Sequence, residues 1–292
     1  MELTATEKRL LALHYFFPVP KNRLNLLYEM DPNLVDFPTY SAEKLAAILK
    51  TTVEKAEKLK VNILKSSLTP YEQLYERYAI TPIPFTNPLY PTHLLTLIDP
   101  PAVLYTQGDI TLLAKKRKMA IIGSRKASFY SKQALSFIVP PLVQNDIVIV
   151  SGLAKGADTL AHKAAMSYGG KTIAVLGHGL FHLYPKENEA IKDEISKKHL
   201  LITEYPPYVR PERWTFPMRN RIISGLSDAI IVTEAARKSG TMSTVEHALE
   251  HGKDIYAVPG SVTSVLSEGP NRLIDEGAQP LWNGFQVIDS LV

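Results

Sequence analysis

The chain has 292 residues, of which 45% are hydrophobic and 21% charged, and its formal net charge is +4. These values exclude a disordered or fibrous protein and predict a globular chain with one large and one small domain. Cysteine is absent, which excludes disulfides, thiolate catalysis and cysteine-ligated metals. Because the N-terminus lacks a signal-peptide pattern and no apolar run reaches the roughly 18 residues of a membrane span, we expect a cytoplasmic protein.

Residues 1–79 show the apolar spacing of helices. Between Val53 and Ile63 apolar residues recur at helical intervals, and Thr51 with Glu54 has the spacing of a capping box ahead of them. Lysines decorate the same stretch, as is typical of a solvated helix face. We predict a small helical domain over these residues.

Residues 80–110 differ in composition from the segments on either side. Prolines recur through this stretch, and residues 104–106 form a short apolar run that ends near Gly108. Proline favours extended backbone and is tolerated at the edge of a sheet. We predict a linker that feeds the sheet edge, with a short strand at residues 104–106.

Six short apolar runs follow, and most are separated by stretches long enough for a helix. They are residues 119–122, 147–150, 172–176, 200–203, 229–232 and 255–258. Nearly continuous, β-branched strands that alternate with helices indicate a parallel sheet covered on both faces. Residues 111–292 are therefore predicted to form a Rossmann-like α/β domain.

Glycine, in most cases with a serine or threonine beside it, follows four of these runs. An open parallel sheet binds its ligand beyond the carboxyl ends of its strands, where glycine permits close approach and a helix N-terminus favours an anion. Any one of these turns could equally be a tight strand–helix connection, whereas four on one edge favour a phosphate-binding site. The candidate residues are Gly123, Ser124, Arg125, Ser151, Gly152, Lys155, Gly177, Ser239, Gly240 and Thr241.

Nucleotide-cofactor motifs fail on inspection. Residues 169–172 read Gly-Gly-Lys-Thr, but Ala165 stands at the first glycine position of a P-loop and Thr172 begins a strand instead of a helix. The sequence Gly177-His178-Gly179 lacks the third glycine of a dinucleotide fingerprint. The histidines are scattered without metal-ligand spacing. We therefore expect no cofactor and no metal.

The densest cationic cluster combines arginines with aromatic residues. Guanidinium groups hold phosphates and exposed rings stack bases, so this mixture favours a single-stranded nucleic acid. The alternative is that the rings belong to the core and the arginines pair with Glu204, Glu212 or Glu234. The cluster consists of Arg210, Arg213, Trp214, Phe216, Arg219, Asn220 and Arg221.

Several motifs occur in a fixed order between residues 80 and 290. They are Ile-Gly-Ser-Arg at 122–125, Ser-Gly-Leu-Ala-Lys-Gly-Ala-Asp at 151–158, Gly-His-Gly-Leu at 177–180, Tyr-Pro-Lys-Glu-Asn at 184–188, Phe-Pro-Met-Arg-Asn-Arg at 216–221, Ser-Gly-Thr at 239–241 and Val-Pro-Gly at 258–260. Each is weak alone. The ordered set closely resembles the DNA-processing protein A (DprA/Smf) family.

This resemblance implies an extended Rossmann-like fold that forms a homodimer and binds single-stranded DNA during natural transformation. It implies protection of incoming DNA in competence and recombination, loading of the RecA recombinase with displacement of single-strand-binding protein, and no enzymatic activity. By residue matching, Arg125 is expected to be the principal phosphate clamp and Lys186 a second, with Arg213 and Phe216 on the strand. Residues 1–79 would match a sterile-alpha-motif-like domain.

Two other functions are weighed against DNA binding. A nucleotide phosphoribohydrolase of the lysine-decarboxylase-like group places a glutamate three residues after a Gly-Thr pair, whereas here Glu246 follows Thr241 by five. Two extra helical positions rotate a side chain by about 200°, away from a pocket. A pure protein-interaction scaffold predicts no salt-sensitive DNA binding at all.

Overall fold

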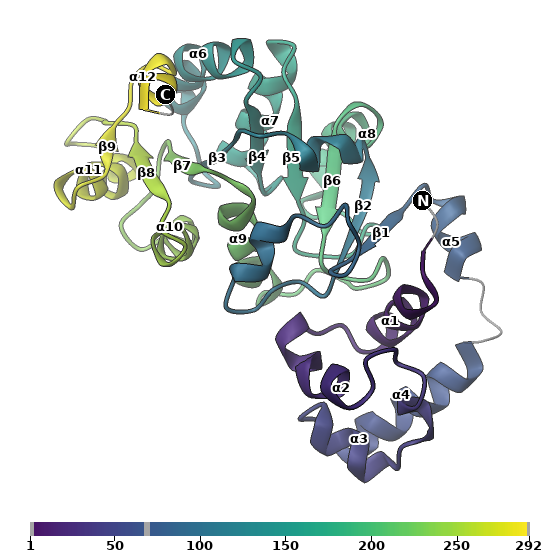
Figure 1. Cartoon of the computed structure of the whole chain (residues 1–292). Helices are drawn as coiled ribbons and strands as arrows, with labels where there is room; N and C mark the ends of the chain where they lie inside the picture. The colour runs from purple at the N-terminus through teal and green to yellow at the C-terminus, as the bar shows by residue number, and fades with distance from the viewer. Residues whose placement is uncertain (1–2, 67–70, 291–292) are drawn as a thin grey trace.

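The computed structural model describes residues 3–66 and 71–290, in which a helical N-terminal domain adjoins a larger α/β domain (Figure 1). The larger domain contains a nine-stranded sheet. Its strands are β1 (Thr81–Pro84), β2 (Val103–Gly108), β3 (Lys118–Ile122), β4 (Val148–Ser151), β5 (Thr172–Val175), β6 (Leu200–Thr203), β7 (Ala229–Val232), β8 (Asp254–Ala257) and β9 (Gln279–Pro280).

The α-helices divide between the two parts of the chain. The N-terminal domain holds α1 (Ala5–Phe16), α2 (Asn25–Met30), α3 (Ala42–Ile48), α4 (Val53–Ser66) and α5 (Tyr71–Arg77). The sheet is covered by α6 (Phe129–Gln144), α7 (Ala157–Ser167), α8 (Glu189–Lys198), α9 (Thr215–Leu226), α10 (Gly240–Glu250), α11 (Glu268–Asp275) and α12 (Phe285–Ser290).

The sheet order is β1-β2-β6-β5-β4-β3-β7-β8-β9. Strands β3 to β8 are parallel, whereas β2 runs antiparallel to β6 and to β1. All six predicted parallel strands are present within one residue of the expected bounds, and the predicted α/β Rossmann-like class is confirmed. The chain returns from β6 past β3 to form β7, so the direction of strand addition reverses between β3 and β7.

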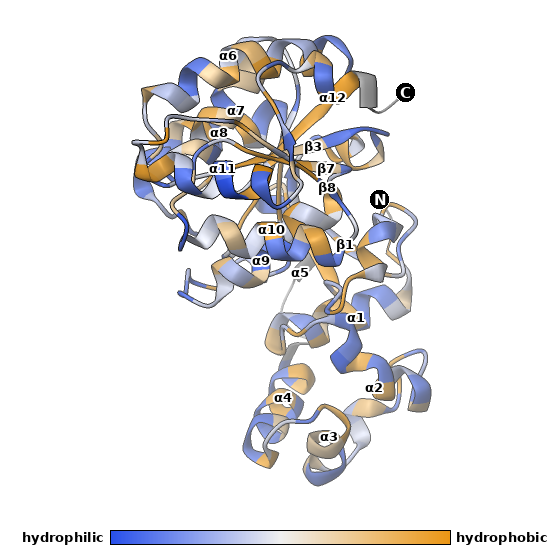
Figure 2. Ribbon diagram, turned by 90° about the vertical axis from the view of Figure 1, so that its left-hand side faces the viewer, coloured by the Kyte–Doolittle hydropathy of each residue, from blue (hydrophilic) through white to orange (hydrophobic). Residues whose placement is uncertain are grey.

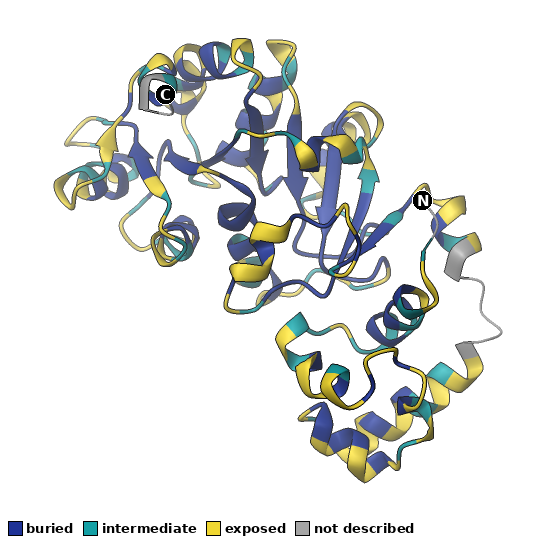
Figure 3. Cartoon of the chain, viewed as in Figure 1, coloured by how far each residue is buried: buried dark blue, intermediate teal, exposed yellow. Residues whose placement is uncertain are grey.

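Alternating residues of the strands pack into separate hydrophobic cores on the two faces of the sheet. In β3, Met119 and Ile121 pack with α6 and α7, while Ala120 and Ile122 pack with α9 and α10. This period of two is the side-chain alternation of a strand. Apolar residues concentrate in the strands (Figure 2), and the central strands are buried (Figure 3). Burial on both faces explains why their sequences are continuous apolar runs.

The N-terminal domain shares a core with one edge of the sheet. Its apolar residues cluster with Val103 and Tyr105 of β2, and His14 of α1 lies 3.1 Å from the Tyr105 hydroxyl. Burial lowers the pKa of His14 to about 3, so this imidazole is neutral at physiological pH. The stretch predicted as a linker contributes β2 and the edge strand β1, and the prolines of β1 lie on this outermost strand, where a missing N–H is tolerated.

Helix capping in the N-terminal domain departs from the sequence prediction. The predicted capping box of Thr51 and Glu54 is wrong by one residue, because Thr52 Oγ1 accepts the hydrogen bond from the Lys55 amide as α4 begins at Val53. A capping box does form at α1, where Thr4 and Glu7 exchange side-chain and backbone hydrogen bonds. Among residues 3–66 and 71–290, no helix combines the length and apolarity of a membrane span.

Candidate nucleic-acid interface

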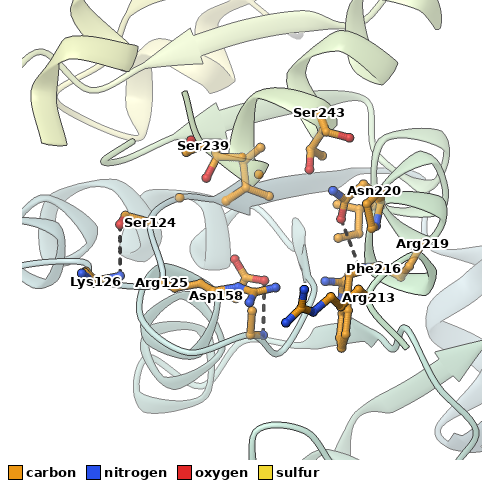
Figure 4. A pocket seen from close by; sticks show the side chains of 18 residues that line it. Ser124, Arg125, Lys126, Asp158, Arg213, Phe216, Arg219, Asn220, Ser239 and Ser243 are labelled. Atoms are coloured by element: carbon orange, nitrogen blue, oxygen red, sulfur yellow. Dashed lines mark hydrogen bonds between the residues drawn. The ribbon is translucent and has the colours of Figure 1, made fainter. Parts of the chain in front are cut away.

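A pocket of about 460 Å³ opens at the carboxyl edge of the sheet, where the strand order reverses (Figure 4). Turns after β3, β4 and β7 line it together with α9, as expected for ligand sites of open α/β sheets. The pocket brings together the predicted residues Gly123, Ser124, Arg125, Arg213, Phe216, Arg219, Asn220, Ser239, Gly240 and Thr241. It leaves out the predicted residues Ser151, Gly152, Lys155, Gly177, Lys186 and Arg221.

Exposed cations and an aromatic ring line this pocket together. Arg125, Lys126 and Arg213 are exposed pocket-lining residues, and the Arg125 guanidinium carbon lies 5.6 Å from the centre of the Phe216 ring. Within the described ranges no ion pair involves these three residues. Their charge is therefore available to an anionic ligand, and the ring is placed to stack against a base.

The N-terminus of α10 lines the opposite wall. Its N-cap residue, Ser239, makes no side-chain hydrogen bond to the helix, and its Oγ is a buried atom without a partner. A Cβ added at Gly240 would meet no atom within 4 Å, so the space before the helix is open. Free amides and the helix dipole make such a terminus favourable for a phosphate.

The sequence predicted that the turn after β4 presents backbone amides to a phosphate, but in the structure two of these amides are bonded to Asp158. Asp158, in the first turn of α7, accepts hydrogen bonds from the amides of Gly152 at 3.2 Å and Ala154 at 3.3 Å. Ser151 is buried and donates to the Ile121 carbonyl at 2.7 Å. The expectation that Ser151 and Gly152 contact DNA is therefore wrong in this structure, because both groups are already satisfied inside the protein.

Arg219 is a buried support of the pocket wall. Its Nη1 donates to the carbonyls of Gly152, at 2.5 Å, and Val175, and its Nε donates to the Asn220 side chain at 3.2 Å. Burial lowers its pKa to about 10, which leaves the guanidinium charged at neutral pH. The expectation that Arg219 extends an exposed phosphate path is therefore corrected: it joins the ends of β4 and β5 beneath the pocket.

Arg221 lies outside the pocket altogether. It is buried and forms an ion pair with the buried carboxylate of Glu204. Burial raises the pKa of Glu204, and the Arg221 charge opposes that shift. The alternative considered from the sequence, that an arginine of this cluster pairs with Glu204, holds for Arg221, and the expectation that Arg221 binds DNA is wrong.

The loop after β5 borders the pocket without lining it. Gly177 is buried against Phe216. A Cβ added at Gly177 would lie 3.0 Å from the Phe216 ring. His178 is also buried, and its Nδ1 lies 3.0 Å from the Gly179 carbonyl oxygen. Lys186 is exposed further along the loop, and Lys155 is exposed but lies 3.9 Å from the carboxylate of Glu187.

Two glycines of the predicted site form a matched pair for mutagenesis. A Cβ at Gly152 would lie 2.2 Å from the Arg219 Nη1, so Gly152→Ala must displace a buried guanidinium. We expect it to lower the free energy of unfolding by about 1–3 kcal/mol. Gly240→Ala enters open space and should stay within about 0.5 kcal/mol of the parent protein. Equilibrium urea unfolding distinguishes them, and equal stabilities would contradict the assigned packing.

Sequence reasoning missed several residues that line the pocket. Ser243 and Thr244 follow Gly240 by three and four positions, which places them on the same face of α10, and Lys126 extends the Arg125 turn. Helical spacing from Gly240 was the signal that could have found the first two. For Lys126, nothing in the sequence indicated that it lines the pocket apart from its position next to Arg125.

The pocket does not hold the acid that the phosphoribohydrolase alternative needs. Glu246 is exposed on α10 and is not one of the lining residues, as its spacing predicts. Of the described residues that line the pocket, Asp158 is the one acidic residue, and its carboxylate is engaged by two amides. Burial raises the pKa of Asp158 while Arg219 opposes the shift. In the part of the chain described by the structure, no cluster of three or more histidine or acidic residues is suited to a metal.

The fold and the pocket define the class of protein: a Rossmann-like α/β protein with a cationic pocket at the point where its strand order reverses. The family model of DNA recombination-mediator protein A matches residues 81–292, and the chain belongs to this family. The resemblance seen in the ordered sequence motifs is thereby confirmed.

Relatives in this family are similar over most of the chain. DNA processing protein DprA of Bacillus subtilis is 42% identical over 217 residues, which cover 74% of this chain and 73% of that protein. The X-ray structure of DNA processing protein A from Streptococcus pneumoniae matches with a TM-score of 0.83 and 34% identity, over 99% of this chain and 98% of that one. The DNA processing protein A of Helicobacter pylori, described for its unique single-stranded DNA binding mode, matches with a TM-score of 0.66 and 34% identity, over 73% and 96% of the two chains.

Proposed function

We propose that this protein binds single-stranded DNA in the pocket above β3 and β7. The observation that carries the proposal is that Arg125, Lys126 and Arg213 line one pocket with the Phe216 ring, which lies beside Arg125, and with the open N-terminus of α10. Cations and helix amides suit phosphates, while the ring suits an unpaired base. The single-stranded DNA binding mode described for the Helicobacter pylori relative supports this choice of ligand.

The mechanism is electrostatic and does not depend on base sequence. A phosphate seated between Arg125 and the first turn of α10 replaces counterions, and a base that stacks on Phe216 is tolerated whatever its identity. Asp158 and Arg219 hold the turns after β4 and β5 in place beneath this contact. The side chains in the pocket bind the strand and carry out no bond-breaking step.

The wider function that we propose follows the family. A recombination mediator delivers DNA to a recombinase, so we propose RecA as the partner, with single-strand-binding protein as the factor displaced, in the cytoplasm during natural transformation. We also propose a homodimer, because two linked pockets on one strand raise its effective affinity without any new contact. The protein would act by protecting and handing over the strand, without enzymatic activity.

Equilibrium titration of labelled oligo-dT and of a duplex of equal length tests the proposal. We expect tighter binding of the single strand and an affinity that falls steeply between about 50 and 200 mM salt, because several phosphates are neutralised. Single strands of other sequence should bind within a few-fold of oligo-dT.

Two results would contradict the proposal. Absence of salt-sensitive DNA binding would favour a pure protein-interaction scaffold. Release of a free base from a nucleoside monophosphate by the purified protein would indicate a phosphoribohydrolase instead.

A further inference from the structure

Three exposed aromatic side chains continue from the pocket toward the N-terminal domain. Tyr184 and Phe181 lie in the loop between β5 and α8, Tyr78 follows α5, and their exposed fractions are 50%, 39% and 42%. The Tyr184 ring centre lies 5.6 Å from that of Phe216, and the Phe181 ring centre lies 4.6 Å from that of Tyr78. We call Tyr184, Phe181 and Tyr78 the aromatic track.

The sheet topology gives the track its direction. The pocket lies above β7, β3 and β4, and the next strands in the sheet are β5, β6, β2 and β1. The loop after β5 is therefore the next structure along the same carboxyl edge, and the N-terminal domain lies beyond it, beside β1 and β2 (Figure 1). Because β1 runs parallel to β6, Tyr78 lies at the start of β1, away from the carboxyl edge, and the Phe181 ring makes the link to it. A strand leaving the pocket over Phe216 meets Tyr184 first and Tyr78 last.

Hydrogen bonds fix the backbone of the loop around the exposed Phe181 side chain. The half-buried Lys192 donates from its Nζ to the carbonyls of the two residues next to Phe181 in the sequence, Leu180 at 2.8 Å and His182 at 3.0 Å. The Phe181 amide donates to the Pro207 carbonyl at 3.0 Å. An exposed ring on a rigid backbone loses little conformational entropy when a base stacks on it.

Cations accompany the rings. The guanidinium carbon of Arg77 lies 5.6 Å from the centre of the Tyr78 ring, and the exposed Lys186 follows Tyr184 by two residues. Exposed ring pairs with a cation near each end match a backbone of phosphates and unpaired bases. They match a protein partner poorly, because such a partner buries a contiguous apolar patch.

We propose that single-stranded DNA leaves the pocket across the aromatic track, so that the N-terminal domain takes part in DNA binding through Tyr78. This inference rests on the proposed function of the pocket. It adds a second segment to the binding site, with base stacking as its main interaction. Strands too short to reach Tyr184 gain nothing from it.

Fluorescence anisotropy with two oligo-dT lengths tests the track, one of about 5 nucleotides to fill the pocket and one of about 15 to reach Tyr78. In the full chain, we expect Phe181→Ala to weaken binding of the longer strand about tenfold and to leave the shorter strand unchanged, because one base stack is lost. Phe181→Tyr keeps the ring and should bind the longer strand within about twofold of the parent protein.

Tyr168→Ala is the matched control, since Tyr168 is 45% exposed but lies at the end of α7, on the opposite edge of the sheet. It should bind both lengths as the parent protein does. If Phe181→Ala binds the longer strand like the parent, or weakens both lengths equally, the track is refuted while the pocket stands. If the parent protein binds neither length, the proposed function itself fails, and the track falls with it.

Discussion

Replacing Arg125 by alanine should weaken binding of every single-stranded sequence by about 10- to 100-fold. Arg125 is exposed beside the Phe216 ring and has no ion-pair partner in the described chain, so its charge is free for a phosphate. Loss of one charge-assisted hydrogen bond of about 1.5–3 kcal/mol accounts for the size of the effect. The slope of log affinity against log salt should also become shallower by about 0.7. Titrations at several salt concentrations measure both quantities.

Lys163→Ala is the control for this substitution. It removes an exposed cation from α7, which covers the sheet face opposite to α9 and α10. We expect its affinity and salt slope to match those of the parent protein within about twofold. If Arg125→Ala and Lys163→Ala behaved alike, the binding would follow total charge, and the pocket would not be the site.

Substitution of Glu204 by alanine should lower the free energy of unfolding by about 3–5 kcal/mol. Arg221 would then remain as a buried charge without its carboxylate partner. Arg221→Ala should destabilise by a similar amount for the converse reason. Urea unfolding followed by far-ultraviolet circular dichroism measures these differences.

The double substitution Glu204→Leu with Arg221→Met separates the charge effect from the loss of volume. Because both charges leave together, its stability should return to within about 1–2 kcal/mol of the parent protein. Its affinity for oligo-dT should be unchanged, since Arg221 does not line the pocket. A large loss of affinity in the folded double variant would restore Arg221 to the DNA-binding residues.

The sequence predicted the sheet well because its central strands are buried on both faces. Continuous apolar runs such as residues 229–232 indicate buried parallel strands when turns and helix-length stretches separate them. The edge strands were harder to predict. β1 carries two prolines, and β9 consists of two exposed residues, Gln279 and Pro280, so neither has an apolar pattern to find.

The candidate site was predicted in position but only partly in detail. Glycine turns at strand ends indicated the edge of the sheet where the pocket lies, and Arg125, Arg213 and Phe216 are among the residues that line it. That they bind DNA stays a prediction. The sequence could not sort the four clustered arginines into exposed and buried ones. Arg219 and Arg221 are two positions apart on α9. Arg219 donates to the Gly152 carbonyl and Arg221 pairs with Glu204. Both partners follow other strands of the sheet and come close to α9 only when the sheet has formed.

Hydrogen exchange measured with and without oligo-dT tests the central claim most directly. We predict slower exchange on DNA binding in the peptides that contain residues 123–127 and 239–242, because the strand covers the Arg125 turn and the free amides at the start of α10. Peptides from α6 and α12, on the other face, should be unaffected. Protection confined to surfaces outside the pocket, with the start of α10 unchanged, would contradict the account.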